Sequence, residues 1–278
     1  MKTINTLLME GKHILKGKVD SSNLDASLLL ADVLRCDRTQ LVRAAAEAVS
    51  EETEMTYKNA LARRLSGECV AYIVGYKEFW GLRFIVNSTV LTPRPDTETL
   101  VEAALAVADA SGARSCLDLC AGSGAVAIAL KRERTHLVVA GSDISKSALE
   151  VARANAETHQ ADVQWIESDL FDHIEDCFDI IVSNPPYIPT SMIAELAPEA
   201  RKEPRLALDG GADGLDYIKK IIVEAKTRLN QGGALLMEAD PRQMSAVAEL
   251  LRENNYQKIR TYQDLSGRDR VIGGICEQ

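Results

Sequence analysis

From residue 97 onward the sequence alternates between short apolar runs and longer amphipathic segments, and this alternation restricts the possible folds more than any other feature. Short apolar runs predict strands, whereas apolar residues spaced three or four apart predict helices. The predicted strands are Ser115–Leu119, Leu137–Gly141, Val163–Glu167, Ile180–Ser183, Ala234–Glu238, 258–262 and 270–275. The predicted helices are 98–109, 125–133, 146–159, 215–229 and 242–254.

Strand–helix repetition of this length predicts an α/β fold with a doubly wound, mostly parallel sheet of seven strands, Rossmann-like in its order of elements. No helix separates the last two predicted strands, so we expect them to form an antiparallel hairpin at one edge of the sheet.

The first part of the chain has a different texture. Apolar residues recur at helical spacing through residues 3–66, which predicts a small bundle of four or five short helices. Alternating apolar residues at Leu82, Phe84 and Val86 follow, with turn residues around them, and predict a hairpin. We therefore expect a helical domain at 1–80, a bridging hairpin or linker at 81–96, and the α/β domain at 97–278.

Composition narrows the classes of function. The formal net charge is −9 and the pI about 5.1, so the chain has no general attraction for nucleic acid, whose affinity comes from Lys and Arg at phosphates. No signal peptide or long apolar run is present, so we expect no membrane association. The six cysteines are scattered, and Cys116 and Cys120 lack a second ligand pair. We expect reduced thiols, no metal and a cytoplasmic protein.

A glycine-rich turn joins the first predicted strand of the α/β domain to the helix that begins at Ala125. The turn reads Cys120-Ala121-Gly122-Ser123-Gly124 and follows Asp118. Glycines in such a turn let the backbone approach a ligand, and the helix N-terminus offers unpaired N–H groups. Many folds use glycines only to turn, so this feature alone is weak.

The next two strands each end in an acidic residue. Asp143 lies about 20 residues on and can accept hydrogen bonds from ribose hydroxyls. Asp169 could meet an adenine amino group while Leu170 covers the ring. Three successive strand ends therefore predict an adenosine pocket. The turn lacks the Gly-x-Gly-x-x-Gly spacing suited to the pyrophosphate of NAD(H), whereas Asp118 suits the positively charged end of S-adenosylmethionine.

The fourth strand decides between these cofactors, because it leads into Asn184-Pro185-Pro186-Tyr187. The plainer interpretation is a proline-stiffened turn. However, an amide or amino nitrogen could be fixed by two acceptors, the Asn184 side-chain oxygen and the Pro185 carbonyl, with Tyr187 beside the planar group. The prolines would hold the acceptors rigidly before the reaction begins. This predicts methyl transfer from S-adenosylmethionine to nitrogen.

Several longer segments resemble the release factor glutamine methyltransferase family (HemK/PrmC), within the class I methyltransferases. Asn-Pro-Pro-Tyr alone is shared with DNA adenine and rRNA guanine amino-methyltransferases. The more specific matches are the segments at 72–81, 91–98, 203–215 and 264–270, which begin YIVGYKEFWG, LTPRPDTE, EPRLALDGG and DLSGRDR.

The resemblance implies N5-methylation of the glutamine in the Gly-Gly-Gln motif of peptide-chain release factors, with the N-terminal helical domain helping to dock the factor. It implies cofactor contacts from the glycine-rich turn, Asp143, Leu170 and Asn184, with Arg94 and Glu98 supporting the pocket wall. Two positions depart from the pattern. Cys120-Ala121 stands where many relatives begin with glycine, and Leu170 replaces an aromatic residue of some relatives.

Three alternatives remain. A DNA or rRNA amino-methyltransferase needs a basic surface and aromatic groups to hold an extruded base, whereas this chain is acidic and 5% aromatic. A non-catalytic binding module would keep the fold without turnover, and failure to bind the cofactor would favour it. A nucleotide-binding dehydrogenase would leave Asn184 to Tyr187 without a role.

Overall fold

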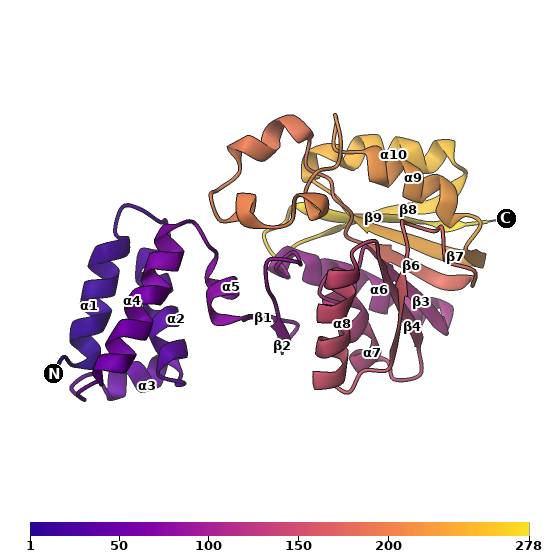
Figure 1. Ribbon diagram of the computed structural model, residues 1–278. Coiled ribbons are helices and arrows are strands. Elements are labelled where there is room, and N and C mark those ends of the chain that lie inside the picture. The colour runs from indigo at the N-terminus through magenta and orange to yellow at the C-terminus, as the bar shows by residue number, and fades with distance from the viewer. Residues whose placement is uncertain (278) are drawn as a thin grey trace. The chain divides into compact units, whose positions relative to one another are not determined.

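A seven-stranded sheet forms the centre of the α/β part in the computed structural model, which describes residues 1–277 (Figure 1). The strand order is β5-β4-β3-β6-β7-β9-β8. The strands are β3 Ser115–Leu119, β4 Val138–Asp143, β5 Val163–Glu167, β6 Phe178–Ser183, β7 Leu229–Glu238, β8 Tyr256–Gln263 and β9 Asp269–Cys276. β3 to β7 pair in parallel, and β9 pairs antiparallel with β7 and β8. The predicted fold class and edge hairpin are confirmed.

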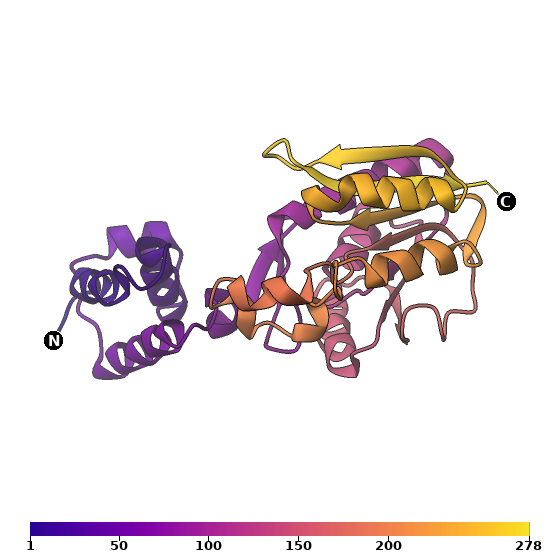
Figure 2. The ribbon, with the colours of Figure 1, turned by 90° about the horizontal axis from the view of Figure 1, so that it is seen from above.

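Helices cover both faces of the sheet, which explains why its central strands are apolar on both sides. Leu117 and Ile181 pack with α9 and α10, whereas their neighbours Cys116 and Ile180 pack with α6 and α7. Figures 1 and 2 show α9 and α10 side by side. The helices are α6 Glu98–Ser111, α7 Ala125–Glu133, α8 Lys146–Thr158, α9 Asp216–Ala225 and α10 Met244–Glu253.

Most predicted boundaries differ from the observed ones by one or two residues, and the largest differences lie between α9 and β7. The expected helix 215–229 ends at Ala225, and the following strand begins at Leu229 rather than Ala234. Leu229 is the register partner of Phe178, ahead of an irregularity in the β6–β7 pairing. Strand pairing therefore claims Leu229, and residues 226–228 form the turn between helix and strand.

Five helices make up the N-terminal bundle, in line with the expected four or five. They are α1 Ile4–Leu15, α2 Ser22–Val33, α3 Arg38–Arg43, α4 Glu51–Leu65 and α5 Val70–Val74. Ser50 caps α4 by accepting a hydrogen bond from the Thr53 N–H at 3.1 Å.

Residues 1–76 form one compact unit together with the short segment Ala197–Lys202. Inside it, buried Arg64 donates to Asp25 at 2.7 Å and to Glu199 at 3.1 Å. The rest of the described chain forms the second unit. In residues 1–277 no helix is long and apolar enough to cross a membrane.

Short 3₁₀ helices of three to six residues lie in the connecting segments. They are η1 Pro95–Thr97, η2 Thr190–Glu195, η3 Ala200–Lys202, η4 Arg205–Ala207 and η5 Pro241–Gln243. A hairpin is present as β1 Tyr76–Phe79 and β2 Leu82–Ile85, so its first strand lies ahead of the expected bounds 81–96.

One buried side chain ties this hairpin to the glycine-rich turn. Asn155 in α8 is fully buried and accepts from the Ile85 N–H at 2.7 Å. Its amide nitrogen donates to the carbonyls of Ile85 at 3.0 Å and Ser123 at 2.9 Å. A single amide thus satisfies backbone groups of two segments that are distant in the sequence, and fixes the hairpin beside the turn.

Replacing Asn155 by Ala should lower the free energy of unfolding by about 2–4 kcal/mol, because buried backbone groups lose their partners. Urea unfolding followed by the fluorescence of Trp80 and Trp165, both in the second unit, measures the change. Asn254→Ala is the matched control, since that amide donates only to Leu250 near the end of its own helix, at 2.8 Å. Equal losses in the two variants would contradict the bridging role of Asn155.

Candidate active site

The carboxyl ends of the central strands meet at one level of the sheet. Leu119 of β3 is the register partner of Ser142 in β4 and of Ser183 in β6. The residues that follow these three, Cys120, Asp143 and Asn184, therefore lie side by side, with Asp143 still paired to Glu167 as the last residue of β4. β4 and β6 lie on opposite sides of β3, so the strand order reverses here. Open α/β sheets bind ligands at such a reversal.

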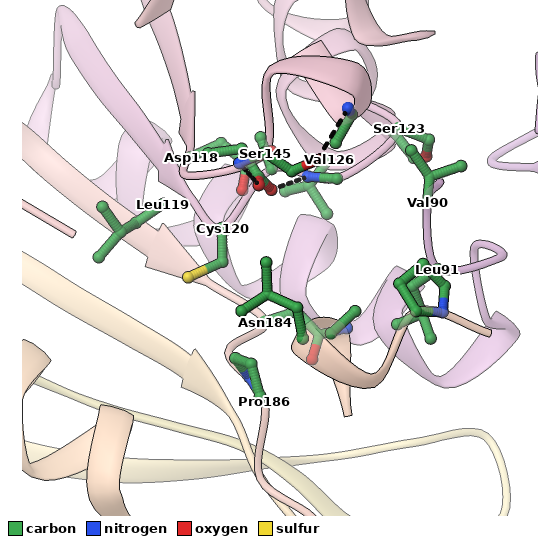
Figure 3. A pocket seen from close by; sticks show the side chains of 18 of the residues that line it. Val90, Leu91, Asp118, Leu119, Cys120, Ser123, Val126, Ser145, Asn184 and Pro186 are labelled. Atoms are coloured by element: carbon green, nitrogen blue, oxygen red, sulfur yellow. Dashed lines mark hydrogen bonds between the residues drawn. The ribbon is translucent and has the colours of Figure 1, made fainter. Parts of the chain in front are cut away.

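A cleft lies at this edge of the sheet, and most of the predicted site residues line it. Figure 3 shows Asp118, Cys120 and Ser123 with Asn184 and Pro186 across from them. The predicted residues that line the cleft are Asp118, Cys120, Ala121, Gly122, Ser123, Asp143, Asp169, Leu170, Asn184 and Pro186. Gly124, Pro185 and Tyr187 are not among its lining residues.

Three residues of the glycine-rich turn have left-handed backbone. The φ angles are 63° at Cys120, 54° at Gly122 and 79° at Gly124. A Cβ atom at Gly124 would lie 2.6 Å from the Trp165 ring, so this glycine gives the indole room behind the turn. The Cys120 backbone has a left-handed conformation that glycine adopts without steric cost, so the position carries a penalty that a glycine there would avoid.

Asp143 organises the backbone at the centre of the cleft. One carboxylate oxygen accepts from the Gly122 N–H and the other from the Ser145 N–H, both at 2.8 Å. Burial raises the pKa of Asp143, and these two N–H groups oppose that rise. Each oxygen keeps a second lone pair, so the carboxylate can hold the turn in place and still accept hydrogen bonds from a ligand.

Asp118 is a buried acid beneath the turn. Its residue is 2% exposed, and its carboxylate accepts from the Ala127 N–H at 3.0 Å. Burial raises the pKa of Asp118 to about 7. Burial disfavours the ionised form of this carboxylate. A cation bound beside it would stabilise that form, because an opposite charge favours ionisation.

The turn after β5 supplies the third side of the cleft. Leu170 has a φ of 47° and is buried, and its carbonyl accepts from the Ser168 hydroxyl at 2.9 Å. Because both Asp169 and Leu170 line the cleft, an acceptor and an apolar surface stand next to each other there. Such a pair suits the edge and the face of a planar heterocycle.

Asn184 is oriented by a hydrogen bond to Thr97, a residue that also lines the cleft. Its amide nitrogen donates to the Thr97 hydroxyl oxygen at 3.2 Å. The carbonyl oxygen is the other end of the same planar amide, so it is the end available to a ligand as an acceptor.

Tyr187 and the glycines after it support the loop from behind. The Tyr187 hydroxyl donates to Glu238 at 3.0 Å, and its carbonyl accepts from Gln243 at 2.9 Å. A Cβ atom at Gly210 would lie 2.7 Å from the Pro186 carbonyl oxygen. Only glycine lets this segment approach the backbone of the proline loop so closely.

The remaining wall was not predicted from the residues alone. It comes from residues 89–94 and from Pro204, Leu206 and Ala207. Glu203 joins the two segments, because it pairs with Arg94 at 2.6 Å and accepts from the Thr92 hydroxyl. Arg94 thus lines the cleft, whereas Glu98 accepts from the Trp80 N–H at 2.7 Å and does not line it. In the sequence, the apolar pair Val90-Leu91 is the feature that could have indicated this wall of the cleft.

The arrangement suits a ligand with a cation, polar hydroxyls and a flat ring, with a second planar group held at Asn184. It offers acidic groups at three strand ends and an amide acceptor at the fourth. Throughout residues 1–277, the structure places no group of three His, Cys, Asp or Glu side chains where they could hold a metal ion.

Two family models match the chain. Residues 6–75 match the PrmC N-terminal domain, and residues 96–199 match the methyltransferase small domain. Among curated proteins, release factor glutamine methyltransferase from Geobacter sulfurreducens is 41% identical over 92% of this chain and 90% of its own length. The protein of that name from Aliivibrio fischeri is 39% identical over 98% of this chain and 94% of its own length.

Solved structures share the fold. A methyltransferase from Pyrococcus furiosus superposes with a TM-score of 0.53 and 18% identity, over 80% of this chain and all of that one. The T. thermophilus 16S rRNA N2 G1207 methyltransferase, in complex with AdoMet and guanosine, superposes with a TM-score of 0.52 and 20% identity. That match covers 73% of this chain and 50% of the T. thermophilus chain.

Two cysteines four residues apart allow a test of the left-handed backbone at position 120. Cys120→Gly should change the free energy of unfolding by less than about 1 kcal/mol, because relief of the left-handed penalty offsets the added chain entropy. Cys116→Gly should cost about 2–3 kcal/mol, since Cys116 is buried within β3. Urea unfolding compares the two. Equal losses would show that the φ angle at Cys120 stores no strain.

Proposed function

This chain belongs to the release factor glutamine methyltransferase family, and we propose that it methylates the side-chain nitrogen of the glutamine in the Gly-Gly-Gln motif of peptide-chain release factors. S-adenosylmethionine supplies the methyl group. The observation that carries the proposal is Asn184, whose amide nitrogen is bound to Thr97 so that its oxygen is presented to a ligand. The curated relatives that span almost the whole chain support the protein substrate.

The cleft fits the cofactor. Asp118 provides a buried negative charge for its amino-acid and sulfonium end, and the glycine-rich turn lines the same cleft. Asp143 suits the ribose hydroxyls, while Asp169 and Leu170 suit the edge and face of adenine. The T. thermophilus methyltransferase, which shares the fold, was solved in complex with AdoMet, and this supports S-adenosylmethionine as the cofactor.

The chain's own residues then position the nitrogen. A primary amide presents two N–H bonds in one plane, and the Asn184 oxygen with the Pro185 carbonyl would accept one each. This fixes the nitrogen in line with the methyl group and excludes rotations that do not lead to reaction. Pro185 and Pro186 restrict the backbone, so the acceptors are placed before the substrate arrives. The proton that the nitrogen gives up can leave to water after transfer.

Two further assignments accompany the proposal. We assign the helical bundle of the first 80 residues to docking of the release factor, because the PrmC N-terminal domain model covers residues 6–75. We also place the protein in the cytoplasm, where peptide release takes place. Substitutions on the surface of the bundle should then leave cofactor affinity unchanged and lower the affinity for the release factor.

An amino-methyltransferase of DNA or rRNA is the second candidate, because it shares Asn-Pro-Pro-Tyr and the fold. The deciding experiment incubates the protein with S-adenosylmethionine and a purified release factor and measures the intact mass of the factor. We expect a gain of one methyl group, which is lost when the Gly-Gly-Gln glutamine is changed to alanine. An unmodified factor, with the cofactor demonstrably bound, would bring the nucleic-acid enzyme forward.

Asn184→Ala should slow methyl transfer by at least about a hundredfold, because it removes an acceptor that acts on the reacting nitrogen. Cofactor affinity, measured by calorimetry, should stay within about threefold. Asn230→Ala is the control, since that exposed amide pairs with Asp179 at 2.7 Å and does not line the cleft. Full activity in the Asn184 variant would refute its role.

A further inference from the structure

The charges that line the cleft are unevenly distributed. Asp118, Asp143 and Asp169 line it from the ends of β3, β4 and β5. Among the described residues that line the cleft, Arg94 is the only Lys, Arg or His. S-adenosylmethionine is not purely cationic, because its methionine part carries a carboxylate as well as an ammonium group. Three aspartates repel that carboxylate, so it needs a cation elsewhere in the cleft.

Arg94 lies one short turn ahead of the residue that orients Asn184. The Thr97 N–H donates to the Arg94 carbonyl at 3.1 Å in η1, and the Thr97 hydroxyl accepts from Asn184 at 3.2 Å. Methyl transfer requires the sulfonium to lie close to the nitrogen that Asn184 holds. The amino-acid part of the cofactor is bonded to that sulfur, so it begins in the part of the cleft that this turn lines.

Glu203 fixes the Arg94 guanidinium without using all of its donors. The Glu203 side chain is 1% exposed, and its two oxygens accept from Arg94 Nη2 at 2.6 Å and from the Thr92 hydroxyl. Within residues 1–277 this is the one side-chain ion pair of Arg94, whose side chain is 44% exposed. A guanidinium has five N–H donors in one plane. Donors therefore remain for a second carboxylate, in a geometry that suits it.

We propose that Arg94 binds the α-carboxylate of S-adenosylmethionine, and that Glu203 is the positioning residue that holds the Arg94 guanidinium at the cleft wall. The ammonium group of the cofactor then lies toward Asp118. Two contacts of opposite charge fix the methionine part, and with it the direction in which the sulfonium presents its methyl group. The inference rests on the cofactor of the proposed function, and it does not depend on whether a release factor accepts the methyl group.

Two ligands that differ only in this carboxylate provide the test. Decarboxylated S-adenosylmethionine keeps the ammonium, the sulfonium and the adenosine. Calorimetry measures the affinity of both ligands for the wild type, Arg94→Met and Arg134→Met. Arg134 is the matched control, since its loss also removes one positive charge and one ion pair, with Asp109 at 2.7 Å, and it does not line the cleft.

Arg94→Met should weaken binding of S-adenosylmethionine by about 10- to 100-fold, as for a lost hydrogen bond between charged groups. Binding of the decarboxylated ligand should weaken by less than about threefold, and Arg134→Met should change neither affinity. Equal losses for the two ligands would show that Arg94 acts only through the shape of the wall. Unchanged affinity for both would show that the carboxylate is held elsewhere. Either result would overturn the proposal.

A second variant keeps the buried pair neutral. Arg94→Met alone leaves Glu203 buried without its cation, which destabilises the wall. Combining it with Glu203→Gln removes both charges, and the glutamine oxygen can still accept from the Thr92 hydroxyl. We expect the double variant to show the same loss for S-adenosylmethionine alone. A raised KM for the release factor with unchanged affinity for S-adenosylmethionine would assign Arg94 to the substrate and contradict the proposal.

Discussion

The parallel pairing of β3 with β4 on one side and with β6 on the other is the constraint on which the rest of the site depends. It sets Leu119 level with both Ser142 and Ser183, so three separate segments of the chain end at the same edge. Apolar side chains on both faces of these strands, packed under helices, hold the register. A slip of one residue in β6 would bury Asn184 or turn it away from the turn that starts at Cys120.

Around this edge the protein keeps several groups in conditions that would be unfavourable elsewhere. Asp118 and Glu238 are buried acids, and burial raises the pKa of each. Cys120 and Leu170 hold left-handed backbone angles. Strained and desolvated groups gather at functional sites, where rigid surroundings keep them in place before the ligand binds. Here the rigidity comes from backbone contacts such as those of Asn155 and Gly210, and not from the reacting residues themselves.

Much of this could be predicted from the sequence. β3 and β5 begin and end where predicted, and the buried residues of β3 have to be largely apolar whatever surrounds them. The turn, the acidic strand ends and the proline loop were recognised because each follows a predicted strand directly. The 215–229 helix was predicted to end four residues too late, at Leu229, whose pairing with Phe178 is a long-range effect. For the same reason Thr97 could not be linked to Asn184, because the two residues are 87 positions apart in the sequence.

The central claim is that the loop after β6 presents a planar side-chain amide for methylation on nitrogen. The most direct test is to carry out acid hydrolysis of a release factor that this protein has methylated with isotopically labelled S-adenosylmethionine. Hydrolysis of an N-methylated glutamine side chain breaks the amide bond, so the account predicts that the label is released as methylamine while glutamate remains. Label retained on the amino acid, or recovered from nucleic acid in the reaction, would contradict it.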